Sequence, residues 1–248
     1  MYKPLNIVIL AFVCVLFLAA IQVHGQEENT PEEGPYSQYF EDGKLKAWLN
    51  YKKGLRNGPF REYYYSGRLS AVGNFKDDKR HGGYKAYFES GTLAAEQTYV
   101  NGDLEGISKE YHENEKLKTE EHYRNGVLEG TAKYFYENGN LKNTMQFKDG
   151  TLNGVSQEFN EDGILKTEMS YKDDQITGVI KEFDDNGRVT TLSAYLNGQK
   201  NGPSKTFYDN GQVEWELNFK DGQMQGPAKK YSPKGKLLVD TPLPLPLP

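Results

Sequence analysis

Nine glycines stand at intervals of 24 residues along this 248-residue chain, and the ladder has no gap. They are Gly34, Gly58, Gly82, Gly106, Gly130, Gly154, Gly178, Gly202 and Gly226. A fixed period in this range is typical of repeat proteins, whose units stack in a line so that each contacts only its neighbours. Such arrays offer a long surface that usually holds a partner.

Each unit repeats the same residue types when its ladder glycine is counted as position 0. The unit that begins at Gly130 has aromatic residues at positions 5 and 17 (Phe135 and Phe147), glycine at position 9 (Gly139) and leucine at position 11 (Leu141). Positions 12, 14 and 16 are mostly polar. Apolar and polar residues therefore alternate with a period of two over positions 11–17 of the unit, which predicts a half-buried β-strand.

A short turn joins this strand to a second strand that leads up to position 5. Several units have Asn-Gly or Asp-Gly in the turn, as at 138–139 and 162–163, and this pair between two strands is a strong hairpin signal. A three-residue loop at positions 7–9 would pair position 5 with position 11. Every position-5 aromatic residue would then lie opposite Leu or Val on one face, and position 9 would be left-handed, which suits glycine.

Two turn positions test this interpretation. Glu115 is the one residue other than glycine at position 9, so we expect strain of about 1 kcal/mol or more there and a local irregularity around residues 112–116. Position 20 is Gly, or Asp at Asp78 and Asp174, which predicts a second left-handed turn.

The sequence thus predicts an all-β fold over residues 34–240. This is an elongated array of antiparallel β-hairpins, with eight full repeats and a partial ninth, in a twisted open sheet.

The flanking segments differ from the array. Residues 1–25 have one charge, an apolar run from Leu5 to Val23 and a Val-His-Gly sequence before Gln26, which predicts a cleaved secretory signal peptide. The alternative is an uncleaved anchor at residues 5–23, because the run is close in length to a membrane span. Residues 26–33 are an acidic spacer, and residues 241–248 (TPLPLPLP) are expected to form an extended polyproline tail. The predicted location is secreted, periplasmic or in the cell envelope.

Composition excludes several function classes. The single cysteine, Cys14, lies in the predicted signal, so the mature chain would have no disulfide framework and no thiolate metal site. Removal of residues 1–25 leaves 29 basic and 35 acidic residues, a net charge of −6. An acidic body gains nothing by approaching phosphate backbones or anionic lipid. We therefore expect no nucleic-acid partner, and membrane contact only through an uncleaved N-terminal segment.

The unit resembles the MORN repeat, and it is most similar to the bacterial MORN-variant class found in YwqK-family antitoxins. The resemblance is carried, for example, by residues 136–141 (Tyr-Glu-Asn-Gly-Asn-Leu) with Phe147 and the pair 149–150 (Asp-Gly). It recurs over about 200 residues. It implies an elongated sheet of antiparallel hairpins that serves as a binding or scaffolding module.

No pattern in the sequence indicates catalysis. It has no serine elbow, phosphate loop or zinc motif. His112 and His122 fall in one repeat, but two ligands without a third do not define a metal site. The acids that recur at position 7 follow from turn chemistry. Lysine recurs at position 3 in six units, which we interpret as a basic line that keeps one face solvated. We expect no enzyme activity, no metal and no cofactor.

Aromatic residues are the best binding candidates. Those at positions 5 and 17 suit a packed face, because they recur in every unit as a structural requirement would. Eight further aromatic residues are not required by the repeat and could grip a sugar or a partner loop. They are Trp48, Tyr64, Tyr65, Phe88, Tyr134, Tyr136, Tyr208 and Trp215.

The function that fits these features best is an exported, non-enzymatic module that binds or scaffolds another protein. One alternative is a cell-wall or polysaccharide-binding module, since solenoids that bind cell walls also combine short hairpins with Tyr and Gly repeats. A second alternative is an antitoxin-like partner of a toxin.

Overall fold

The computed structural model describes residues 31–241, and these form strands and turns in one open antiparallel sheet. The all-β prediction is confirmed. The predicted signal peptide (1–25), most of the acidic spacer and nearly all of the Pro/Leu tail lie outside the described residues.

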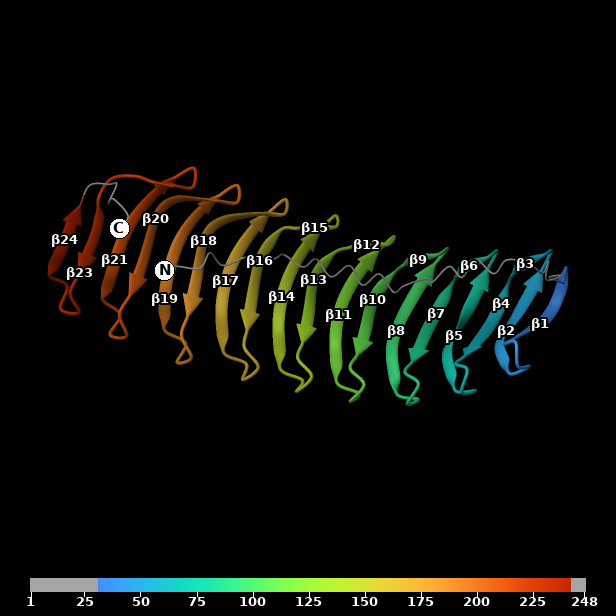
Figure 1. Cartoon of the computed structure of the whole chain (residues 1–248). Coiled ribbons are helices and arrows are strands. Elements are labelled where there is room, and N and C mark those ends of the chain that lie inside the picture. The colour runs from blue at the N-terminus through green and yellow to red at the C-terminus, as the bar shows by residue number, and fades with distance from the viewer. Residues whose placement is uncertain (1–30, 242–248) are drawn as a thin grey trace. The chain divides into compact units, whose positions relative to one another are not determined.

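Nine hairpins follow one another along the sheet, which Figure 1 shows as a row from β1 in blue to β24 in red. The paired strands are β1 (Glu33–Tyr39) with β2 (Leu45–Lys52), β4 (Gly58–Tyr63) with β5 (Leu69–Lys76), β7 (Gly82–Tyr87) with β8 (Leu93–Val100), β10 (Gly106–Tyr111) with β11 (Leu117–Arg124), β13 (Gly130–Phe135) with β14 (Leu141–Lys148), β16 (Gly154–Phe159) with β17 (Leu165–Lys172), β18 (Gln175–Phe183) with β19 (Val189–Leu196), β20 (Gln199–Phe207) with β21 (Val213–Lys220), and β23 (Ala228–Tyr231) with β24 (Leu237–Thr241).

Six two-residue strands lie between the hairpins: β3 (Leu55–Arg56), β6 (Lys79–Arg80), β9 (Asp103–Leu104), β12 (Val127–Leu128), β15 (Thr151–Leu152) and β22 (Gln223–Met224). They extend the pairing of the preceding strand beyond the turn at positions 19–20, as where Lys52 pairs with Leu55. The second strand of each hairpin also pairs with the first strand of the next, as β2 does with β4. The sheet is therefore an uninterrupted meander.

The hairpin loop spans positions 7–9, as predicted. In the first unit the Phe40 amide donates to the Lys44 carbonyl at 2.8 Å, and the Gly43 amide donates to the Phe40 carbonyl at 2.9 Å. Tyr39 at position 5 pairs with Leu45 at position 11, which confirms the predicted pairing.

The predicted facing of position 5 is wrong, because the register shifts directly after that pair. Position 4 pairs with position 13, so position 12 is an extra residue in the second strand. Such a bulge interrupts the alternation between positions 11 and 13, so position 5, although paired with position 11, does not share the face of position 17. In the last unit, for example, the Tyr231 hydroxyl donates to the Glu216 carboxylate at 3.2 Å, on the side of the sheet opposite to position 17.

The second turn is left-handed at position 20 as expected, and also at position 19. Asp77 and Asp78 have φ of 49° and 64°, which gives the two-residue turn that matches strand twist. The position-20 amide then donates to the position-22 carbonyl of the preceding unit. This bond recurs seven times between units, at 2.8–3.1 Å, as from Asp78 to Arg56 and from Gly102 to Arg80, and Gly54 makes the equivalent bond to Glu32 before the first unit. The ladder glycines also have positive φ, from 72° at Gly226 to 131° at Gly154, where the chain enters the next hairpin.

One face of the sheet, here called the packed face, is built from positions 2, 13, 15 and 17. The packed face holds two apolar clusters, and the first joins units one to three. Its buried members are Ala47, Leu49, Tyr51, Phe60, Ala71, Phe75 and Tyr84. Phe60 is 1% exposed, and its ring lies against Phe75 at 4.6 Å between centroids and over Gly73, its cross-strand partner.

We predict that Glu115→Gly stabilises the array by roughly 0.5–1 kcal/mol, since glycine relieves the left-handed strain but loses more chain entropy. Glu115 has φ of 67°, yet its loop keeps the same two bonds as the other units, so the expected irregularity around 112–116 is not present. Urea unfolding measures the effect. Glu113→Gly, at a residue without positive φ, should lower the midpoint. An unchanged or lower midpoint for Glu115→Gly would contradict the strain.

We predict that Gly73→Ala destabilises the array by about 1–3 kcal/mol, the usual cost of overpacking. A Cβ at Gly73 would lie 2.8 Å from Phe60 Cε1, so the ring has to move. The matched control is Gly83→Ala, where a Cβ meets no atom within 4 Å. Thermal unfolding should separate the two variants, and Phe60→Leu should recover part of the loss in the Gly73→Ala background. Equal melting temperatures would show that the ring does not need this space.

Candidate functional site

The other side of the sheet, built from positions 1, 3, 14 and 16 and here called the open face, has a ladder of ion pairs. The strand register places position 3 opposite position 14 of its own hairpin and beside position 14 of the preceding one. Lys85 pairs with Glu96 at 2.9 Å, and Lys181 pairs with Glu168 at 2.7 Å. The Lys181 ammonium, and then the Gln157 amide, lower the pKa of the Glu168 carboxyl. The position-3 lysines, which the sequence analysis interpreted as a basic line, are therefore largely neutralised by the acids at position 14.

The first two units interrupt this ladder, because position 14 is Trp48 in one and Val72 in the next. Arg61 at position 3 pairs with both of them in the strand register. Its guanidinium carbon lies 5.8 Å from the centre of the Trp48 ring, within range of a cation–π interaction. Among residues 31–241, Arg61 has no ion pair with a carboxylate, whereas each lysine at position 3 has an acid at one or both neighbouring positions 14.

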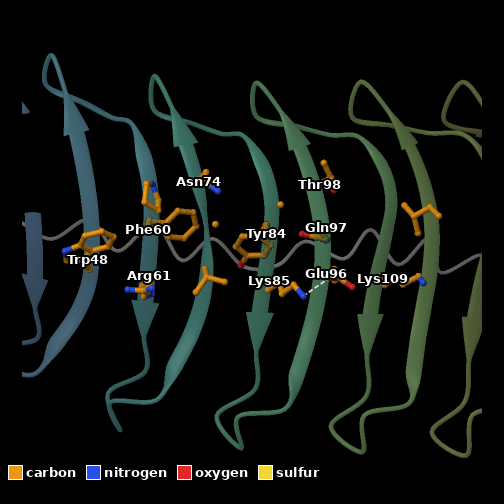
Figure 2. Close-up of a pocket in the computed structure, with 15 residues that line it drawn as sticks. Trp48, Phe60, Arg61, Asn74, Tyr84, Lys85, Glu96, Gln97, Thr98 and Lys109 are labelled. Atoms are coloured by element: carbon orange, nitrogen blue, oxygen red, sulfur yellow. Dashed lines mark ion pairs between the residues drawn. The ribbon is translucent and has the colours of Figure 1, made fainter. Parts of the chain in front are cut away.

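A shallow hollow of about 650 Å³ opens beside this pair (Figure 2). Trp48, Pro59, Val72 and Ile107 give it an apolar lining, and Ile107 is 48% exposed. Gly83, at position 1 of the open face, also lines it, and its lack of a side chain keeps it open. Its polar lining residues include Arg61, Asn74, Thr98, Lys85, Glu96 and Lys109. The site therefore combines one indole ring, aliphatic surface and hydrogen-bond donors.

The structure distributes the eight candidate aromatic residues over several surfaces, and only Trp48 lines the hollow. Tyr64, Phe88, Tyr136 and Tyr208 all stand at position 6, at the hairpin ends. Each of the three tyrosines donates its hydroxyl hydrogen to the position-5 carbonyl of the next unit, at 2.7–2.8 Å. These hydroxyls thus join neighbouring units.

The other three candidates lie elsewhere. Tyr65 is 57% exposed on a hairpin loop, with Lys44 4.0 Å above its ring. Tyr134, at position 4, lies on the packed face, where its hydroxyl donates a hydrogen bond to the Glu121 carboxylate at 2.9 Å. Trp215, at position 13, has Lys230 5.0 Å from its ring. Arg61, Val72 and Ile107 were not among the residues predicted from the sequence. The signal for them was visible there, because position 14 is not acidic in either of the first two units.

The described residues give no geometry for metal chemistry. No group of three or more His, Cys, Asp or Glu side chains gathers within residues 31–241. His112 takes the same place as the position-6 tyrosines, with its Nε2 3.0 Å from the Phe135 carbonyl oxygen.

A helix with the length and apolar character needed to span a membrane is not found among residues 31–241.

Six stretches of the chain match the family model described as MORN repeat variant, and together they cover more than half of it. The chain belongs to the MORN repeat variant family. The matched residues are 32–53, 80–101, 104–125, 128–149, 152–173 and 200–221. The match is to the repeat variant as a class, and the similarity to YwqK-family antitoxins stays a prediction.

Solved structures resemble this MORN array weakly. One is the wild-type TCP10 domain of Danio rerio CPAP in complex with a peptide of Danio rerio STIL, at 15% identity and a TM-score of 0.29, covering 85% of this chain and 100% of that one. Another is the TcdB2-TccC3-Cdc42 complex, at 10% identity and a TM-score of 0.21, covering 83% of this chain and 13% of that one. No curated protein matches the chain.

We predict that Tyr136→Phe destabilises the MORN array by about 1 kcal/mol, the usual net value of a hydrogen bond, because the bond to the Phe159 carbonyl is lost. Phe88→Tyr is the matched opposite change, since it adds a hydroxyl at the same position of another unit. Urea denaturation should move the two midpoints in opposite directions. Two unchanged midpoints would show that these hydroxyls do not join the units. The aromatic residues at position 6 would then again be candidates for binding.

Proposed function

We propose that this MORN array is an exported, non-enzymatic module that binds another protein through the hollow on its open face. The observation that carries the proposal is the interruption of the ion-pair ladder at Trp48 and Val72. The fold does not require an apolar residue at position 14, because glutamate takes that position in four other units. Tryptophan and arginine are among the side chains that dominate binding energy at protein interfaces, and here Trp48 and Arg61 lie together beside aliphatic groups of the hollow.

The lining of the hollow favours a protein over a sugar chain. Val72, Ile107 and Pro59 are aliphatic, and Trp48 is the one aromatic residue in the lining with its ring on the open face. A flat sugar face would be gripped by a row of such rings. The shallow form of the hollow suits a segment of a partner that lies on the sheet, and the charged pairs around it form a polar rim.

Export is the second part of the proposal, and it rests on the apolar run from Leu5 to Val23 and the cleavage pattern before Gln26. We expect the mature chain to begin at Gln26 and to be recovered outside the cytoplasm. N-terminal sequencing of the native protein tests this. A chain that begins at Met1 and stays in the cytoplasm would contradict export and favour the antitoxin-like alternative.

Binding is tested by a pull-down from native envelope material with residues 26–248 as bait, followed by mass spectrometry. We expect one protein near stoichiometry with the wild type and about tenfold less with Trp48→Glu, a loss of about 1.4 kcal/mol. This substitution introduces the residue that other units already have, so the fold should be kept. Leu192→Glu is the matched control at position 14 of another unit, and it should retain the partner.

Two results would overturn binding through the hollow. One is equal recovery of the protein by wild type and Trp48→Glu. The other is retention of the bait on the insoluble polysaccharide fraction with no enriched protein, which would instead support the glycan-binding alternative.

A further inference from the structure

The chain itself contains a segment whose chemistry matches the hollow. Residues 242–248 alternate Pro and Leu. Proline fixes φ and has no amide hydrogen, so such a segment loses little entropy on binding and presents carbonyl acceptors together with apolar side chains. Other proline-rich segments, which have prolines three residues apart, dock in grooves lined by aromatic residues.

The hollow provides the complementary groups. Trp48, Val72 and Ile107 offer apolar surface, and Arg61 offers guanidinium hydrogens that are not committed to any carboxylate among the described residues. Lys85 and Lys109, in contrast, are paired with Glu96 and Glu120. A segment without charge, rich in carbonyl acceptors, therefore fits this part of the open face better than the regular ladder beside it.

The dimensions also agree. Five strand steps separate β2, which carries Trp48, from β10, which carries Ile107. At about 4.8 Å for each step this is about 24 Å. Seven residues in the polyproline conformation, at about 3.1 Å each, extend about 22 Å. A Pro/Leu segment that crosses the strands would thus extend over most of the distance between the strands of Trp48 and Ile107.

The segment cannot reach the hollow of its own chain. Eleven strand steps, about 53 Å, lie between β10 and β24, after which the segment begins. Figure 1 shows β1 and β24 at opposite ends of the row of hairpins. Seven residues span at most about 25 Å. Any docking of this kind must therefore be intermolecular.

We propose that the hollow binds the Pro/Leu segment 242–248 of a second copy of this chain. The contact is heterologous, because one copy contributes its segment and the other its hollow. Such contacts generate open chains of subunits unless the geometry closes them. The proposal rests on the proposed function, because it uses the same hollow and names the partner as another copy of the chain.

Sedimentation velocity of residues 26–248 over a concentration series tests the proposal. We expect species larger than a monomer that grow with concentration in the wild type and in Leu192→Glu. Trp48→Glu and a deletion of residues 242–248 should each be monomeric. Circular dichroism of all four proteins checks the fold. A wild type that stays monomeric, or assembly that persists after the deletion, would overturn the proposal.

A mixture of the two monomeric variants gives the sharpest result. Trp48→Glu keeps the segment and lacks the hollow, whereas the deletion variant keeps the hollow and lacks the segment. We expect the mixture to form a one-to-one dimer and no larger species. A synthetic peptide of residues 241–248 should bind the deletion variant and prevent this dimer, with at least about tenfold weaker binding after Trp48→Glu, a loss of about 1.4 kcal/mol.

The two proposals fail in different ways. If the mixture stays monomeric while the deletion variant still recovers a different protein in the pull-down, self-association through the segment is wrong and protein binding by the hollow stands. If neither the mixture nor the pull-down depends on Trp48, the hollow itself is wrong as a binding site.

Discussion

Each 24-residue unit turns back twice in the sheet, and both turns need residues with positive φ. The first turn places position 9 in the left-handed region, and the second places positions 19 and 20 there. The second turn also brings the position-20 amide to the preceding unit, where it donates to the position-22 carbonyl. Backbone geometry therefore joins one unit to the next, and the ladder glycine, again with positive φ, starts the next hairpin in register. Side chains can vary on both faces without loss of this connection, so the array can carry a local site on a regular frame.

Much of this frame could be predicted from sequence, because it depends on signals that recur every 24 residues. The strand at positions 11–17, the three-residue loop and the left-handed residue at position 20 were all visible as periodic residue types. The facing of position 5 was not, since an extra residue at position 12 shifts the register and no residue type marks that bulge. The tolerance of Glu115 was also not predictable. Its loop keeps both backbone bonds, so strain at one φ angle does not alter the turn.

The candidate site was harder to predict, because it depends on contacts between units. Arg61 is opposite Val72 in its own hairpin and beside Trp48 of the preceding one, and that juxtaposition follows only from the register. Trp48 was a candidate from the sequence, as an aromatic residue that the repeat does not require. Tyr64, Tyr136 and Tyr208 met the same criterion, yet their hydroxyls bond to the next unit. An aromatic residue outside the repeat pattern is thus an incomplete criterion. A break in the pairing between positions 3 and 14 is the more selective signal.

The central claim is that binding occurs at the hollow of the first units and not along the whole open face. Three aliphatic residues at position 1 allow a direct comparison, because Ile107, Val155 and Val179 are 48%, 40% and 45% exposed, and only Ile107 lines the hollow. Hydroxyl-radical footprinting of the array, with and without its bound protein, measures the reactivity of each side chain. The account predicts that Trp48 and Ile107 become protected while Val155 and Val179 stay reactive. Protection of Val155 and Val179 with Ile107 unchanged would contradict it.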